Sequence, residues 1–244
     1  MPLERGISSL DNLYIALDFP TGKEAKHFLI ENELTGASVK VGMELFYREG
    51  PQIIDTLKER GHKVFLDLKL HDIPNTVHQA MKNLAKLEVD IVNVHAFGGS
   101  EMIAGAREGL LAGSSQGVSP YLIAVTILTS FDEKSFQEDL KLEEGISNYA
   151  LHLAEMSKTS GADGVVCSVQ EAEPVKNLCG NDFLTVTPGI RLASDDPGDQ
   201  KRVASPGFAR RNGSDILVVG RPITQAKNPK LAYEQFIREW TTNE

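Results

Sequence analysis

Three charged side chains follow an apolar run in the segment 64–76. Asp67, Lys69 and Asp72 place a carboxylate, an ammonium and a second carboxylate within six residues. Alternate side chains of a strand share a face, so Asp67 and Lys69 are expected to point the same way. Grouping charges costs stability unless each has a partner. The pattern indicates either a structural ion pair at a strand end or a site that holds an ammonium between two carboxylates.

The residues after this charged group indicate a turn and then a helix. Pro74 cannot donate a hydrogen bond to a neighbouring strand, so the strand is expected to end before it. Asn75 or Thr76 is expected to cap the following helix, because Val77 and Met81 continue at helical spacing. The charged side chains therefore belong to a junction between a strand and a helix.

Eight short apolar runs, rich in β-branched residues, alternate with helical segments along the chain. The expected strands are residues 13–18, 37–42, 64–70, 91–95, 121–128, 164–168, 183–187 and 215–219. Such alternation predicts parallel strands joined by helical crossovers. Eight units in 244 residues predict an α/β fold, a (β/α)₈ TIM barrel that forms a single domain over 1–244. A doubly wound open sheet is the competing architecture, although no GxGxxG follows a strand.

Polar residues recur where the expected strands end. These residues are Asp18, Lys40, Asp67, Lys69, His95, Thr129, Arg191 and Arg221. In a barrel the carboxyl ends of all strands form one rim, and sites are built there. Cations and carboxylates from the first three strands are thus expected on one side of the rim, and the two arginines on the other.

The last two strands carry features of a phosphate site. Loops after strands seven and eight of barrels frequently bind phosphate, Gly220 lets backbone amides approach it, and Arg221 can bind it with two hydrogen bonds. Residues 193–211 are rich in Gly, Pro, Asp, Ser and Arg and show little apolar periodicity. This segment reads either as a functional loop over the site, with Gln200 as an uncharged phosphate donor, or as a plain surface loop.

Bulk composition excludes several classes of protein. A net charge of −9 argues against a broad nucleic-acid or membrane surface, and 41% hydrophobic residues suffice for a sizeable core. Two cysteines are too few for a disulfide framework, and no apolar run reaches membrane-spanning length. With no signal pattern at the N-terminus, a cytoplasmic protein is expected.

The motif Asp67-x-Lys69-x-x-Asp72-Ile73-Pro74-x-Thr76 resembles the signature of the orotidine 5′-monophosphate decarboxylase family. Six shorter matches extend the resemblance over essentially the whole chain. They are Asp18 in Leu-Asp-Phe, Lys40 in Lys-Val-Gly, Leu128-Thr129-Ser130, Pro188-Gly189-Ile190-Arg191, Gln200, and Gly220-Arg221-Pro222. The chain is most similar to free-standing bacterial enzymes, without a fused phosphoribosyltransferase.

The resemblance implies conversion of orotidine 5′-monophosphate to UMP and CO₂ in pyrimidine biosynthesis, with no metal or organic cofactor. Lys69 would face and protonate the carbanion, Asp67 would lie near the departing carboxylate, and Asp72 with Lys40 would complete an alternating charge network. It also implies a homodimer in which Asp72, Ile73 and Thr76 reach into the neighbouring subunit's site.

The same resemblance implies which residues bind the rest of the nucleotide. Asp18 and Lys40 would hold the ribose hydroxyls, and Thr129, in preference to Ser130, would read the base amide. Pro188 would also bind the substrate. The phosphate ligands would be Arg221, Gln200 and the Gly220 amide, with Arg191 close by.

Two rival functions stay open. A 3-keto-gulonate-phosphate decarboxylase shares Asp67-x-Lys69-x-x-Asp72 but uses Mg²⁺ to hold an enediolate, so metal dependence would separate the two. A catalytically silent nucleotide-binding barrel is the other, although binding alone would not require such costly charges. Fold by itself decides neither.

Overall fold

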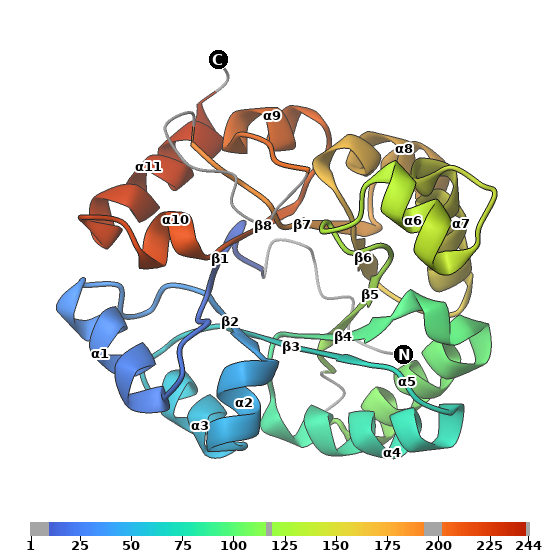
Figure 1. Ribbon diagram of the computed structural model, residues 1–244. Helices are drawn as coiled ribbons and strands as arrows, with labels where there is room; N and C mark the ends of the chain where they lie inside the picture. Colours follow the sequence, from blue (N-terminus) through green and yellow to red (C-terminus); the bar gives the residue numbers. More distant parts are fainter. Residues whose placement is uncertain (1–9, 116–118, 193–201, 243–244) are drawn as a thin grey trace.

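Eight parallel strands close into a barrel in the computed structural model, which describes residues 10–115, 119–192 and 202–242 (Figure 1). Each strand pairs with its neighbours in chain order, and β8 pairs with β1. The strands are β1 (Leu13–Ala16), β2 (Val39–Gly42), β3 (Val64–Leu70), β4 (Ile91–His95), β5 (Tyr121–Val125), β6 (Gly164–Val166), β7 (Leu184–Thr187) and β8 (Ile216–Val219). The predicted (β/α)₈ barrel is confirmed, and the open sheet is wrong.

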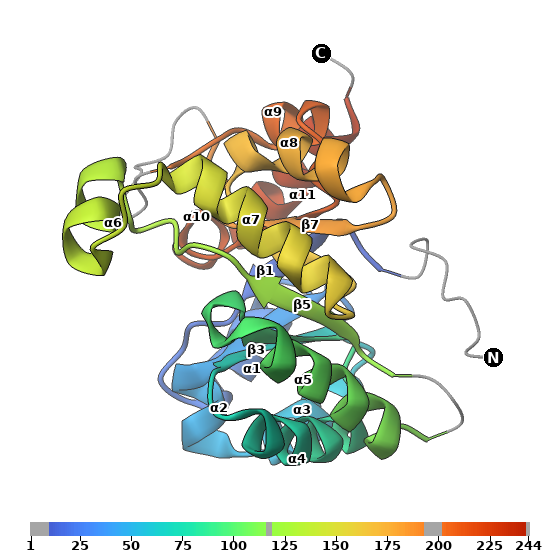
Figure 2. The same ribbon diagram turned by 90° about the vertical axis from the view of Figure 1, so that its right-hand side faces the viewer.

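Helices connect the strands and form a ring around the barrel (Figure 1). They are α1 (Gly22–Glu31), α2 (Met43–Glu49), α3 (Gln52–Lys58), α4 (Pro74–Leu84), α5 (Gly99–Gly113), α6 (Glu133–Leu140), α7 (Ile146–Thr159), α8 (Val169–Cys179), α9 (Pro206–Arg211), α10 (Arg221–Thr224) and α11 (Pro229–Thr241). Figure 2 shows α6 standing away from the barrel wall, on the side where β5 ends. No helix in the described ranges is long and apolar enough to cross a membrane.

Strand side chains alternate between the barrel interior and the helix layer. Tyr14, Phe65, Ile91 and Ile216 pack together inside the barrel, whereas Val92 belongs to the larger core under the helices. Two residues further along β3 and β4, the inward positions are Asp67 and Asn93, and both are buried. The interior therefore changes from apolar to polar toward the carboxyl ends of these strands.

Helices α4 and α5 lie side by side and approach each other at backbone contact (Figures 1 and 2). Gly105, Gly109 and Gly113 are spaced by four, so they form one stripe on α5. A Cβ at Gly109 would lie 2.2 Å from the carbonyl oxygen of His78, and one at Gly113 would lie 2.1 Å from that of Lys82. Glycine is therefore required for this close packing of the two helices.

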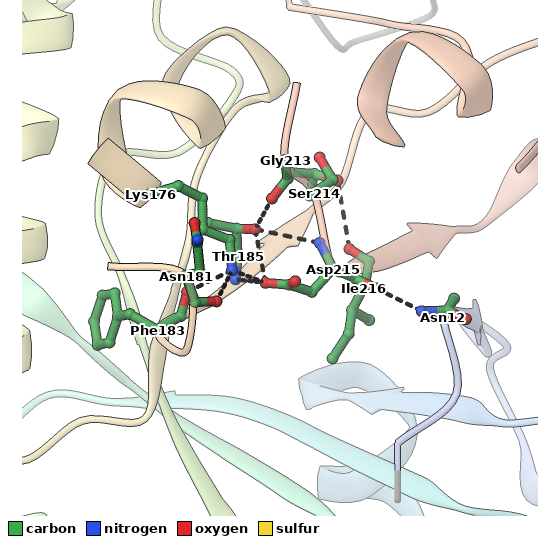
Figure 3. Close-up of polar contacts among 10 residues, drawn as sticks. Asn12, Lys176, Asn181, Phe183, Thr185, Gly213, Ser214, Asp215 and Ile216 are labelled. Atoms are coloured by element: carbon green, nitrogen blue, oxygen red, sulfur yellow. Dashed lines mark hydrogen bonds and ion pairs between the residues drawn. The ribbon is translucent and has the colours of Figure 1, made fainter. Parts of the chain in front are cut away.

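A polar network joins α8, β7 and the start of β8 at the amino ends of the strands (Figure 3). Lys176 Nζ donates to Asp215 Oδ2 at 2.6 Å and to the carbonyl oxygens of Asn181 and Phe183 at 2.8 and 2.9 Å. The buried Thr185 hydroxyl lies 2.7 Å from the Gly213 oxygen and 3.0 Å from Asp215 Oδ2. The network fastens neighbouring elements together at the end of the barrel opposite the rim.

Several local expectations differ from the structure, and β1, β2 and β6 are each two residues shorter than expected. The helix after β3 begins at Pro74 with Ile73 as N-cap, and neither Asn75 nor Thr76 caps it. The fixed φ of proline suits the first helical position, so Pro74 both ends the strand and starts the helix. Strand β5 ends at Val125 rather than 128. The end of the expected loop 193–211 forms α9, where Ser205 Oγ accepts a hydrogen bond from the Phe208 amide.

Candidate active site

Four charged side chains, from β2, β3 and the residues just after β1, form a continuous row at the rim. Lys40 Nζ lies 3.4 Å from Asp18 Oδ1 and 3.0 Å from Asp67 Oδ2. Lys69 Nζ lies 2.6 Å from the other Asp67 oxygen, Oδ1. A Cβ on Gly42 would lie 3.1 Å from Lys40 Nζ, so this glycine leaves room for the ammonium. The structure thus brings together four of the residues that the sequence placed at one side of the rim.

Burial and charge act against each other at the centre of the row. Burial alone would lower the pKa of Lys40, but Asp67 and Asp18 outweigh it and raise that pKa above its usual value. Burial would likewise raise the pKa of Asp67, yet Lys40 and Lys69, together with a hydrogen bond from Asn93, lower it to about 2. Both groups are therefore charged at neutral pH.

Lys69 occupies a strained backbone position. Its φ is +50°, in the left-handed region that residues with a side chain rarely adopt. Pairing between β3 and β4 also shifts register here, because Leu66 faces Val92 but Leu70 faces Val94. Strain and bulges of this kind concentrate at functional sites. The ammonium reaches Asp67 from an irregular strand, not from the regular alternation that the sequence suggested.

Asn93 is a buried member of the site that the sequence reading missed. Its Nδ2 donates to Asp67 Oδ1 at 2.6 Å, and its Oδ1 accepts from the Lys69 backbone amide at 2.8 Å. The signal was available, since a polar residue interrupts the apolar run of β4 in phase with His95.

A cavity of about 300 Å³ opens beside the charged row. Lys40, Asp67 and Lys69 border it on one side. Its apolar wall comes from Phe65, Val125, Ile127, Leu128, Val166, Val186 and Val218. A cavity lined mainly by apolar side chains, with a few convergent polar groups, is typical of a small-molecule site.

Besides Lys40 and Asp67, two more predicted binding residues line the same cavity, and a third lies beside it. Thr129 and Pro188 are part of the lining, and Thr129 is buried. A Cβ on Gly220 would lie 3.8 Å from Asp18 Oδ2, which puts the end of β8 next to the charged row. The rim therefore gathers residues from strands far apart in the sequence.

The two predicted phosphate arginines lie outside the cavity lining. Arg191 is buried after β7, where its amide donates to the Ala204 oxygen at 2.9 Å and its Nη1 to the Ile190 oxygen. Arg221 is exposed at the first position of α10. Gln200 lies outside the described residues.

The three residues that the resemblance assigned to a neighbouring subunit are exposed. Ile73 is 68% accessible, a high value for a large apolar side chain. Asp72 and Thr76 are exposed beside it, and Asp72 Oδ1 accepts a hydrogen bond from the Ile73 amide. Asp72 thus makes no ion pair with Lys69 among the described residues of one chain.

The two histidines near the rim stack on each other. The rings of His71 and His95 lie 5.6 Å apart, and His95 also contacts Phe97. Burial, then the neighbouring His71 and Lys69, lower the pKa of His95 to about 4, so it is neutral at pH 7. No group of three or more His, Cys, Asp or Glu side chains in the described part of the chain could hold a metal ion.

Comparisons with known proteins agree on one family. Residues 11–236 match the model of the orotidine 5′-phosphate decarboxylase / HUMPS family. Over 230 residues the chain is 54% identical to the orotidine 5′-phosphate decarboxylases of Bacillus cytotoxicus and Bacillus mycoides, covering 94% of this chain and 97% of each relative.

Solved structures give the same result. An uncharacterized conserved protein from Geobacillus kaustophilus is 47% identical with a TM-score of 0.83, over 94% of this chain and all of that one. Orotidine 5′-phosphate decarboxylase from Lactobacillus acidophilus is 42% identical with a TM-score of 0.81, over 95% of this chain and all of that one. The chain therefore belongs to the orotidine 5′-phosphate decarboxylase / HUMPS family.

Proposed function

We propose that the charged row carries out the decarboxylation of orotidine 5′-monophosphate, with Lys69 as the proton donor. The chain is an orotidine 5′-phosphate decarboxylase, and its product UMP belongs to pyrimidine biosynthesis. The observation that best supports the role of Lys69 is its ammonium, held 2.6 Å from Asp67 Oδ1 at the edge of a cavity of about 300 Å³.

The reaction breaks the bond between ring carbon C6 and its carboxylate. The electron pair stays on C6, in the plane of the ring, where it cannot delocalise into the π system. The barrier is therefore high, and the site must lower it by an amount toward the upper end of the ~8–23 kcal/mol that enzymes supply. CO₂ leaves, Lys69 Nζ gives a proton to C6 to form UMP, and solvent returns a proton to Lys69.

Fixed charge supplies the stabilisation in this proposal. An ammonium positioned before the reaction stabilises the growing charge on C6 without reorganising during it. Asp67 lies beside the departing carboxylate, and Lys40 on its other oxygen keeps Asp67 ionised. The closeness of two carboxylates then disfavours the bound substrate relative to the transition state.

Asp72 completes the charge network from a second copy of the chain, together with Ile73 and Thr76. Their exposure in a single chain supports this assignment, because buried residues could not reach another subunit. A homodimer with two shared sites follows from it.

The remaining rim residues bind the parts of the nucleotide that do not react. Asp18 and Lys40 bind the ribose hydroxyls, Thr129 contacts the base, and Pro188 also binds the substrate from the cavity wall. The phosphate is bound by Arg221, Arg191, Gln200 and the Gly220 amide. Binding energy from the phosphate can then be used at the reacting carbon.

The first test is turnover of orotidine 5′-monophosphate, followed by its ultraviolet change, with and without EDTA. We expect equal rates in both conditions. Activity only on a sugar phosphate with Mg²⁺ would indicate the rival sugar-phosphate decarboxylase, and UMP binding without any turnover would indicate a silent barrel.

The phosphate assignment is tested with Arg221→Ala. Charge-assisted hydrogen bonds contribute about 1.5–3 kcal/mol, so the Kd for UMP should rise about 10- to 100-fold while that for uridine stays unchanged. Calorimetric titration measures both, and Arg238→Ala, an exposed arginine on α11, serves as the control. Equal losses for UMP and uridine would rule out the phosphate role.

A further inference from the structure

We propose that Asn93 is a positioning residue for the decarboxylation. Its side-chain amide holds the Lys69 backbone and the Asp67 carboxylate in fixed positions relative to each other. This inference rests on the proposed roles of those two residues. Asn93 is 1% exposed, and its amide makes hydrogen bonds to both of them. Asn93 lies on β4, the strand that pairs with β3, and from there its side chain contacts the charged row.

The carbonyl oxygen of the Asn93 side chain replaces a backbone acceptor that the Lys69 N–H would have in a regular sheet. From Leu66 to Leu70, β3 advances four residues while β4 advances only two, from Val92 to Val94. Regular pairing is interrupted inside this stretch, and a buried backbone N–H needs another acceptor. Asn93 Oδ1 accepts a hydrogen bond from the Lys69 backbone N–H at 2.8 Å. The asparagine therefore holds the bulge at the residue whose φ is +50°.

The NH₂ group of the Asn93 side chain fixes the carboxylate of Asp67, which faces the Lys69 ammonium. Asn93 Nδ2 donates to Asp67 Oδ1, the same oxygen that accepts from Lys69 Nζ. Lys40 holds the other oxygen at 3.0 Å. Three donors on two oxygens leave the carboxylate one orientation. The direction of the Lys69 side chain and the orientation of its partner thus depend on one neutral side chain.

The substitution Asn93→Asp distinguishes the acceptor role of the amide from its donor role without changing the size of the side chain. The introduced carboxyl group can still accept the Lys69 N–H. When protonated, it also donates to Asp67 as the amide does, and when ionised, it repels Asp67. Asp67 and burial favour its protonated form, and the ammonium groups of Lys40 and Lys69 favour its ionised form. Catalysis by Asn93→Asp should therefore depend on pH in a way that the wild type does not.

The experiment compares kcat and KM of wild type, Asn93→Asp and Asn93→Ala between pH 4.5 and 8.5. At pH 8 we expect kcat of both variants to fall about 100-fold, the usual effect of losing one preorganised donor. The KM should change less than about 3-fold, since Asn93 is not proposed to touch substrate. As pH falls, kcat of Asn93→Asp should recover, while kcat of Asn93→Ala should not.

The control is Thr185→Val, which removes a buried hydrogen-bonding hydroxyl from the network at the other end of the barrel (Figure 3). Its stability in urea should fall while its kcat stays at the wild-type value. If kcat of the Asn93 variants stays within 3-fold of wild type, or if only KM changes, Asn93 does not position the site. If Asn93→Ala does not fold, Asn93→Asp carries the test alone. Failure of the wild type to turn over the nucleotide would instead reject the proposed function.

Discussion

Two lysine–aspartate pairs lie at opposite ends of the barrel, and the distance between nitrogen and oxygen is the same in both. Lys69 and Asp67 at the rim are 2.6 Å apart, as are Lys176 and Asp215 near the amino ends of the strands. The difference lies in what else the ammonium contacts. Lys176 donates to three acceptors and so uses all of its hydrogens. Among the described residues, Lys69 Nζ contacts Asp67 alone.

Under the proposed function, this difference separates a structural pair from a reactive one better than distance or charge does. A saturated ammonium has no hydrogen left for a ligand, so the network in Figure 3 can only hold elements together. An ammonium with one partner beside a cavity has hydrogens available for a substrate. The general expectation for barrels is the same: chemistry at the carboxyl ends of strands and stability at the amino ends.

The largest expected effect is on turnover at the rim. Lys69→Ala removes the proposed proton donor and its positive charge, so kcat should fall about 10⁴-fold or more. The Kd for UMP should stay measurable, because the ribose and phosphate contacts are elsewhere. Stopped assays at high enzyme concentration measure kcat, and calorimetric titration measures the Kd for UMP. Near-normal turnover would show that the contrast between the two lysines has no catalytic meaning.

The matched change at the other end should affect stability and leave catalysis alone. Lys176→Met leaves the partly buried Asp215 carboxylate without its ammonium, which should cost about 3 kcal/mol of unfolding free energy. Urea unfolding measures the loss, and kcat/KM of the folded protein should equal that of wild type. A fall in kcat without a fall in stability would mean that this network reaches the site.

A smaller effect should appear in acid. The pKa of Asp67 falls from 3.8 to about 2 on folding, so its ionised form stabilises the folded state. That contribution is present above about pH 4 and is lost as the pH falls toward 2, by an amount of about 2 kcal/mol. Wild type should therefore lose more stability than Asp67→Asn over this range in urea unfolding at several pH values. Parallel curves for the two proteins would contradict the lowered pKa.

The sequence predicted the fold and most of the charged row because both depend on local pattern. Apolar runs alternating with helical segments are sufficient to predict a barrel, and a barrel puts Asp18, Lys40 and Asp67 on one rim. The bulge at Lys69 could not be predicted, because it depends on how β3 pairs with β4. Asn93 does interrupt the apolar run of β4, which marks it as a polar position, but its contacts with Asp67 and Lys69 depend on how the strands pair.

The glycine stripe of α5 has a consequence for association. Helix α4 starts directly after Asp72 and Ile73, and its backbone rests on Gly109 and Gly113 with no side chain between. Such a contact has no rotamers to immobilise and little room to shift. The exposed segment is thus already ordered before anything docks on it. In the proposed dimer, a second copy that docks there would lose little conformational entropy, and more of the contact energy would remain as affinity.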